Sequence, residues 1–193
     1  MIRGYYWVIL WLLLLTGCEI AVKQPELHDF GLPPLTTTNV SRVNTPTIEL
    51  DAPKWIWDNR IRYRFLYKSP TKVNFYTLDR WIASPPELFK QELISRSQAL
   101  NQPLLVKFLN FEQQFESPKQ AKAVIRLAVT VLSPENNKPL ANKEFYYQRY
   151  TLSADAKGAV DAFSILVNQS IGDIDRWLIR VQEQHPVENR QNL

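Results

Sequence analysis

The sequence predicts a two-layer α+β domain in which two helices cover a mostly antiparallel sheet. Two observations predict this fold class: segments of alternating apolar and polar residues come in pairs separated by turns, and two longer segments repeat apolar residues every three or four positions. In chain order the elements run strand-strand-strand-helix-strand-strand-strand-helix. Strands joined by short turns pair antiparallel, and two helices suffice to cover one face of such a sheet.

The first half of the domain is predicted to hold three strands. Thr47–Leu50 starts the folded part as a short strand. Arg60–Phe65 alternates with period two, which places an aliphatic residue and two aromatic residues on one face and three arginines on the other. After the turn at Ser69-Pro70, Val73–Tyr76 completes a hairpin.

A helix start follows the hairpin. Ser84 stands at the N-cap position, Pro85 suits the first helical position, and Glu87 occupies the third position of a capping box. Apolar residues at helical spacing continue to about residue 100, so the sequence predicts a helix of that extent.

The second half is predicted to hold three further strands and a long helix. Leu104–Phe111 is the first strand, and Ala123–Leu132 and Phe145–Leu152 form a hairpin. Lys157–Gln184 repeats apolar residues at threes and fours, which indicates a helix with a wide buried face. Gly172 inside this helix indicates a bend or a close approach of the backbone.

Composition is that of a folded domain with a modest basic excess. The chain has 193 residues, of which 45% are hydrophobic and 12% aromatic, enough to bury a core. The formal net charge of +4 is spread along the chain. It favours contact with acidic lipid headgroups or an acidic partner over nucleic acid.

The N-terminus resembles a lipoprotein signal. Arg3 precedes the uncharged, mostly apolar run Tyr5–Leu15, which as a helix spans only about 16 Å against about 30 Å of hydrocarbon, and is therefore a signal segment and not a membrane span. Leu15-Thr16-Gly17-Cys18 matches the lipobox, and Cys18 is the only cysteine of the chain. A plain secretory signal with a chance cysteine is the alternative.

The lipobox predicts cleavage before Cys18 and acylation of that cysteine. Several acyl chains at one terminus exceed the two-anchor threshold for stable membrane attachment. Glu19 follows the cysteine where Asp favours the inner membrane, so we expect the periplasmic face of the outer membrane. The predicted organisation is a signal peptide (1–17), an acylated, Pro- and Thr-rich linker (18–46), the α+β domain (47–185) and a flexible tail (186–193).

Motifs that carry catalytic chemistry are missing from the sequence. His28 lies in the predicted linker and His185 at the end of the domain, and five glycines leave no room for a phosphate-binding loop. We therefore predict a protein that is not an enzyme and has no cofactor or metal. An envelope hydrolase that uses converging carboxylates stays open as an alternative, with these candidates: Asp51, Asp58, Asp79, Glu87 and Asp173.

Aromatic and basic residues concentrate between Trp55 and Trp81. One interpretation is a hairpin with an aromatic core face and a charged solvent face. The other is a partner-binding surface, because Trp, Tyr and Arg are enriched at interface hot spots. The residues predicted to bind a partner are Arg62, Arg64, Tyr76, Arg80 and Trp81.

The same region resembles a known family. Arg62-Tyr63-Arg64, Val73-Asn74-Phe75-Tyr76 and Arg80-Trp81-Ile82-Ala83-Ser84-Pro85-Pro86 are similar to the ABC-type transport auxiliary lipoproteins, the PqiC-like proteins. Phe30-Gly31-Leu32-Pro33-Pro34 and the closing amphipathic helix fit the same layout, so the resemblance spans about residues 28 to 183.

This resemblance implies a non-enzymatic accessory subunit of an envelope transport system. Such systems pair an ABC ATPase and permease with an MCE-type periplasmic protein that moves lipids between membranes. The expected partners are therefore the membrane, through the lipid at Cys18, and the MCE-type protein with its permease. An assembly lipoprotein of an outer-membrane barrel or secretion complex is the alternative.

Overall fold

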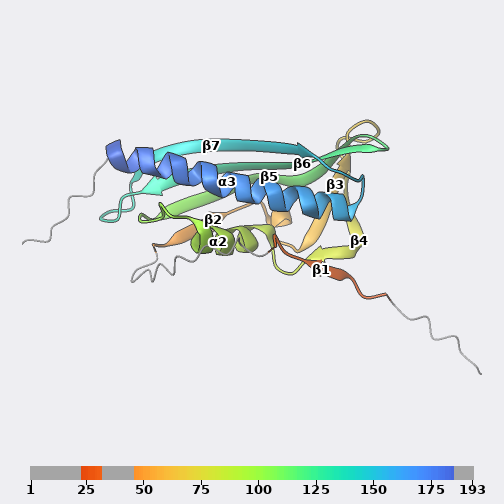
Figure 1. Ribbon diagram of the computed structural model, residues 1–193, viewed down its shortest axis with the longest axis horizontal. Coiled ribbons are helices and arrows are strands. Elements are labelled where there is room, and N and C mark those ends of the chain that lie inside the picture. Colours follow the sequence, from red (N-terminus) through yellow and green to blue (C-terminus); the bar gives the residue numbers. More distant parts are fainter. Residues whose placement is uncertain (1–22, 32–45, 185–193) are drawn as a thin grey trace, which may run out of the picture.

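The computed structural model describes residues 23–31 and 46–184, which form one sheet, two α-helices and one turn of 3-10 helix (Figure 1). In chain order the elements are β1 (Glu26–His28), β2 (Ile48–Asp51), η1 (Lys54–Ile56), β3 (Arg60–Phe65), β4 (Val73–Trp81), α2 (Pro85–Arg96), β5 (Leu104–Ser117), β6 (Gln120–Leu132), β7 (Pro139–Tyr150) and α3 (Ala156–Gln184).

Strand β5 is the centre of the sheet. On one edge it pairs antiparallel with β6, which in turn pairs antiparallel with β7. Its other edge takes two strands end to end, because Ile48–Asp51 of β2 pairs parallel with its first residues and β3 pairs parallel with its last. The sheet then continues through β4 to β1, which pairs parallel with the end of β4.

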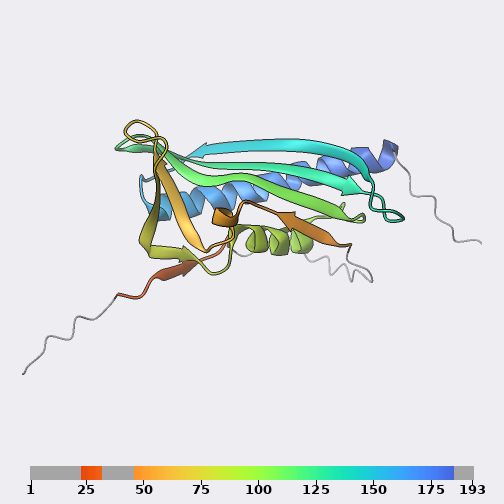
Figure 2. The ribbon, with the colours of Figure 1, turned by 180° about the vertical axis from the view of Figure 1, so that it is seen from behind.

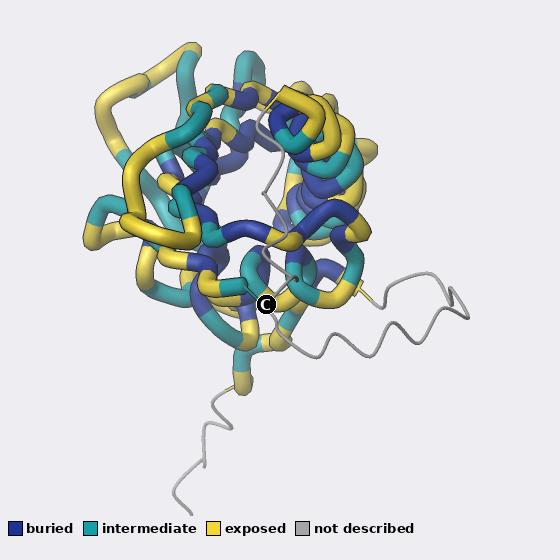
Figure 3. Tube along the Cα trace, turned by 90° about the vertical axis from the view of Figure 1, so that its left-hand side faces the viewer, coloured by how far each residue is buried: buried dark blue, intermediate teal, exposed yellow. Residues whose placement is uncertain are grey.

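Helices α3 and α2 cover the same face of the sheet. Figure 2 views the sheet from the side away from α3, and Figure 3 shows the buried segments turned inward between the layers. The Phe111 ring of β5 stacks on the Phe163 ring of α3 with centroids 4.2 Å apart, and Phe89 of α2 lies 5.5 Å from Phe108 of β5. A strip of large side chains along β5 therefore joins both helices to the sheet.

The opposite face of β5, β6 and β7 is open and polar. It carries ion pairs that run across neighbouring strands, with nitrogen–oxygen distances of 2.8 Å for Lys107–Asp51 and 2.7 Å for Lys122–Glu116. Arg126 pairs with Glu144 in the same way. A sheet that buries one face and solvates the other is typical of antiparallel architecture.

The predicted fold class is confirmed. The antiparallel pairings β3–β4 and β6–β7 correspond to the two hairpins that the sequence predicted, and β5–β6 is a third antiparallel pairing. Helix α3 matches the predicted long helix to within one residue. The capping box is also present, since the Ser84 amide donates to Glu87 Oε2 at 3.1 Å. Helix α2 ends at Arg96, earlier than predicted, and β5 extends six residues beyond Phe111.

The predicted linker is wrong for one stretch of the chain. Residues 26–28 form β1, and Phe30 is only 2% exposed in the core. His28, predicted to lie in a loose linker, is held in this strand and pairs with Asp79 at 2.9 Å. Residues 26–31 therefore belong to the folded domain, whereas residues 18–22 and 32–45 of the predicted linker lie outside the described residues.

The close backbone approach in α3 occurs at Gly158 and not at Gly172, where the sequence predicted a bend or a close approach. A Cβ on Gly158 would lie 2.1 Å from the Ser153 carbonyl oxygen, so the close approach occurs here, in the first turn of the helix. A Cβ on Gly172 would meet only the end of the Arg176 side chain at 3.7 Å, which is an ordinary contact.

Several predictions concern residues that the structure does not describe. The signal peptide (1–17), Cys18, His185 and the tail (186–193) all lie outside the described residues. Within the part that is described, none of the helices combines the length and the apolar character needed to cross a bilayer.

Candidate functional site

The five residues predicted to bind a partner all lie on β3 and β4, but the structure does not present them as one surface. Arg62 is only 4% exposed, and its guanidinium lies 2.7 Å from Asp58. Burial raises the pKa of Asp58, yet hydrogen bonds from Arg60 and Arg62 outweigh burial and hold that pKa below its ordinary value. Arg62 is therefore a buried guanidinium paired with a carboxylate that is 32% exposed.

Arg64 and Tyr76 fasten the hairpin to the central strand. Arg64 donates from Nε to both carboxylate oxygens of Glu112 at 3.1 Å, and from Nη1 to the Pro70 carbonyl at 3.0 Å. The Tyr76 hydroxyl donates to Gln113 Oε1 at 2.6 Å, and burial raises the pKa of Tyr76 well above its ordinary value. Both side chains have partners within the fold.

Trp81 and Arg80 are neighbours that point in opposite directions. Trp81 is 1% exposed and packs between Phe30 and Phe163, with ring centroids at 5.2 and 5.8 Å. Arg80 is exposed on the open face of the sheet. Of the five predicted residues, only Arg80 is exposed to solvent, and Trp81 is a core residue that a partner cannot reach.

A different aromatic surface exists at the end of the β3–β4 hairpin. Tyr63 lies at the centre, with ring centroids 4.6 Å from Tyr76, 5.2 Å from Phe65 and 5.6 Å from Phe115. Tyr67 in the turn packs on Phe65 and is 46% exposed. We call these five residues the hairpin-tip cluster. Phe115 is buried at 4% exposure, whereas the other four residues are at least partly exposed. These four are rigid aromatic side chains of the kind that interface hot spots use, and the turn between β3 and β4 lies at one end of the molecule (Figure 1).

The second exposed surface lies on β1 and β4. Leu27 and Ile82 are each 60% exposed and Leu78 is 40% exposed. Arg80 lies between Leu78 and Ile82 in the chain and pairs with Leu27 across the strands. We call these four residues the β1–β4 patch. Sequence reasoning missed it because three-residue β1 lies in a segment interpreted as linker.

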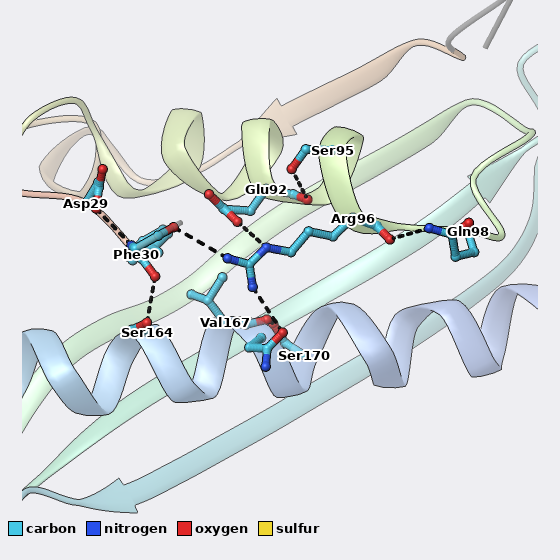
Figure 4. A network of polar contacts seen from close by, with 11 residues as sticks. Asp29, Phe30, Glu92, Ser95, Arg96, Gln98, Ser164, Val167 and Ser170 are labelled. Carbon is cyan, nitrogen blue, oxygen red and sulfur yellow. Dashed lines mark hydrogen bonds and ion pairs between the residues drawn. The ribbon is translucent and has the colours of Figure 1, made fainter. Parts of the chain in front are cut away.

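The segment after β1 is clamped onto both helices, as Figure 4 shows. The Ser164 hydroxyl of α3 donates to the Phe30 carbonyl at 2.6 Å. Arg96 at the end of α2 donates to Asn168 of α3 at 3.0 Å and reaches the Gly31 carbonyl at 3.5 Å. Gly31 has φ +83°, a backbone conformation that favours glycine.

One group of possible metal ligands forms among the described residues. Glu26, His28 and Asp79 each place a ligand atom within 4.8 Å of the others. Here His28 Nε2 and Asp79 Oδ1 are hydrogen-bonded at 2.9 Å, so the pair joins β1 to β4 directly. We interpret this group as a structural hydrogen-bonded contact at the edge of the sheet.

The five carboxylates considered for a hydrolase do not converge. Each is engaged separately: Asp51 with Lys107, Asp58 with Arg60 and Arg62, Asp79 with His28, Glu87 with Ser84, and Asp173 with Arg176. An acid/base pair needs two carboxyl groups on one reacting bond, roughly 5–9.5 Å apart, in a shared cleft. None of these pairings joins two of the five carboxylates.

Comparison with known proteins shows which solved structures share this fold. Neither the protein-family models nor the curated proteins contain a match to this chain. Among solved structures, the chain shares its fold with a class of α+β proteins. One of them is described only as an uncharacterized protein; it has a TM-score of 0.60 and 11% identity, and the match covers 80% of this chain and 99% of that chain.

A second member of that class carries a family name. It is protein XCC0632 from Xanthomonas campestris, of family DUF330, with a TM-score of 0.64, 17% identity, and coverage of 72% of this chain and 84% of that chain. DUF330 is the PqiC-like family that the 61–86 region resembles. This chain is therefore similar in fold to a DUF330 protein.

Proposed function

We propose that this chain is an outer-membrane lipoprotein, acylated at Cys18, that serves as a non-enzymatic accessory subunit of an ABC/MCE-type lipid transport system. The observation that carries the proposal is the similarity in fold to a DUF330 protein, in a chain that also has the lipobox Leu15-Thr16-Gly17-Cys18. The sequence motifs resemble those of the PqiC-like proteins, and the similarity in fold to a DUF330 protein supports the same proposal.

The structure adds a short tether to this proposal. From Cys18 to the first residue of β1, Glu26, the chain spans at most about 28 Å when fully extended. The domain is therefore held close to the membrane that carries the lipid. A partner on the same membrane, or one that reaches it, meets the domain at a high effective concentration.

The hairpin-tip cluster is our choice for the contact with an MCE-type protein. Tyr67 is its most exposed member, and Lys68 and Lys72 in the same turn are exposed as well. Aromatic side chains flanked by lysines suit a partner surface with apolar pockets and acidic residues.

Anchoring is tested by metabolic labelling of the full chain with palmitate. Wild type should incorporate label and fractionate with the outer membrane, whereas Cys18→Ser should do neither. Label that persists in Cys18→Ser would overturn the acylation site, and label found in the inner membrane would overturn the outer-membrane address.

The transport role is tested by photo-crosslinking in native membranes. A photo-reactive residue replaces Tyr67, and the matched control replaces Ile179, a 48% exposed residue near the far end of α3. Capture of an MCE-type protein or its permease from Tyr67 alone supports the proposal. Capture of an outer-membrane barrel or a secretin would favour the alternative, an assembly lipoprotein.

A further inference from the structure

The open face of the sheet changes character from one edge to the other. Over β5, β6 and β7 it carries ion pairs such as Arg126–Glu144, together with two exposed tyrosines, Tyr146 and Tyr150. At the β1 edge the large exposed side chains are aliphatic, and Leu27, Leu78 and Ile82 are each exposed by 40% or more. Exposed aliphatic residues are common singly, but a group that shares one face indicates a contact surface.

Three residues of the β1–β4 patch share this face. Leu78 and Arg80 of β4 are exposed, whereas Asp79 is partly buried and Trp81 is buried. Ile82 follows directly after β4 and, with Leu27, lines a hollow beside Val160 and Asp161 of α3, so it extends the patch around the edge of the sheet. Leu27 of β1 is paired with Arg80 and so projects from the same side of the sheet. The patch is therefore one aliphatic surface around a single guanidinium.

The short distance along the chain between Cys18 and the β1–β4 patch indicates which partner this patch contacts. The tether runs directly into β1, so Leu27 lies only nine positions after the acylated residue. Strand β1 is fixed to the domain, because Phe30 is 2% exposed and His28 pairs with Asp79. A lipid inserted at Cys18 therefore holds this edge of the sheet, of all the described parts, nearest to the bilayer surface.

Charge on the same edge fits a bilayer surface with anionic lipids. Arg80 is exposed, and its partner across the strands is Arg60, which is also exposed. Lys23 lies in the described part of the tether and is exposed too. Four of the nearby carboxylates have partners: Asp58 with Arg60, Asp79 with His28, Asp161 with Lys157, and Asp29, which accepts from the Gly31 amide. Exposed Glu26 lies on the opposite face.

We infer that the β1–β4 patch lies on the membrane surface that holds the acylated Cys18, with its three aliphatic side chains in the interface and Arg80 at the lipid phosphates. The inference rests on the proposed function only for the lipid at Cys18. It adds a defined orientation: the sheet edge at β1 faces the lipid. Aliphatic anchors combined with basic residues are the usual chemistry of interfacial binding.

The first test places one fluorophore at a time on the acylated protein. Cys18 is the only cysteine, so its acylation leaves a newly introduced cysteine as the single free thiol. Ile82→Cys carries a polarity-sensitive dye in the patch, and Leu152→Cys, at a residue 96% exposed between β7 and α3, is the control. In vesicles of phosphatidylethanolamine and phosphatidylglycerol (3:1), the Ile82 dye should shift to shorter wavelength and be quenched by lipid-borne quenchers.

The outcomes separate the inference from the proposed function. If dyes at Ile82 and Leu152 both report water in reconstituted acylated protein, the patch does not lie on lipid and the inference is overturned. If the Ile82 dye leaves water only after an MCE-type protein is added, the patch binds protein and the inference is equally overturned. Failure of palmitate labelling would instead remove the proposed function.

A second test needs no lipid anchor. The chain from Glu19 contains every described residue and should bind the same vesicles weakly at low salt. Leu27→Ser with Ile82→Ser should lower the bound fraction at least about tenfold, because aliphatic burial drives interfacial binding. Leu152→Ser with Ile165→Ser, which changes two exposed aliphatic residues elsewhere, should leave it unchanged. Equal binding by both double variants would contradict the inference.

Discussion

Phe30 is expected to hold the tether end of the domain in place, and Phe30→Ala tests this. The side chain is 2% exposed and lies against Trp81 and Phe111, with ring centroids at 5.2 and 5.9 Å. Removal of a buried phenylalanine costs about 3–5 kcal/mol. We expect a value near about 3 kcal/mol, because β1 lies at the edge of the sheet and can detach while the rest stays folded.

Two measurements on the chain from Glu19 check this prediction. Urea unfolding followed by tryptophan fluorescence gives the change in the free energy of unfolding. Hydrogen exchange reports β1 itself, because the Ile82 amide donates to the His28 carbonyl at 2.8 Å and should lose protection when β1 detaches. Leu27→Ala, at a 60% exposed residue of β1, is the control and should change stability by less than about 0.5 kcal/mol.

A small effect would refute the reasoning. If Phe30→Ala lowers the free energy of unfolding by less than about 1 kcal/mol and the Ile82 amide stays protected, Phe30 does not clamp β1. If the prediction holds, the variant also lengthens the tether. With β1 released, the extended reach from Cys18 to the start of β2 at Ile48 grows to about 100 Å.

The remaining predictions concern local features of the two helices. Gly158→Ala should destabilise the domain by about 1–3 kcal/mol in urea unfolding, because its Cβ would lie 2.1 Å from the Ser153 carbonyl oxygen. Gly172→Ala should stabilise it by about 0.5–1 kcal/mol, since its Cβ meets only an ordinary contact. Hydrogen bonds from the Ser84 hydroxyl and amide lower the pKa of Glu87, so its contribution is present above the ordinary value of 4.5 and is lost as pH falls through the lower folded pKa. Glu87→Gln keeps the cap geometry and should flatten the loss of stability with acid below that value; an unchanged pH profile would contradict it.

Local patterns account for the parts of the fold that the sequence predicted. Hairpins such as β3–β4 and β6–β7 join neighbouring segments, and both their alternation and their turns are visible in a short window of sequence. The long helix α3 and the capping box at Ser84 are equally local.

Parallel pairings could not be predicted in this way. Strand β1 has three residues, too few for a periodic signal, and its partner on β4 lies about fifty residues later in the chain. The one available signal was Phe30, a large aromatic residue in an otherwise polar and Pro-rich segment. Strand β2 pairs with β5 across a similar separation.

The exposure of the predicted site residues could be predicted only in part. Alternation correctly separates the arginines of β3 from the aromatic residues, but it does not say which faces other elements cover. Arg62 is buried although it lies on the charged face. The bulge in β4, where Arg62 pairs with Phe75 but Arg60 pairs with Arg80, shifts the alternation and turns Trp81 into the core. The burial of Arg62 and of Trp81 therefore depends on how the strands pair and pack in three dimensions, which the local sequence pattern does not show.

The central place of β5 has a consequence for how the chain folds after export. Residues 26–96, from β1 to the end of α2, leave the translocation channel before the strand that receives β2 and β3. The segments from β5 to α3 pair with sequence neighbours, so we expect the folding nucleus to form there. Until then β2 and the β5-facing edge of β3 lack their partner strand, and under the proposed function the lipid would be attached before the domain has folded. Periplasmic chaperones that bind extended apolar chains should therefore associate with the N-terminal half.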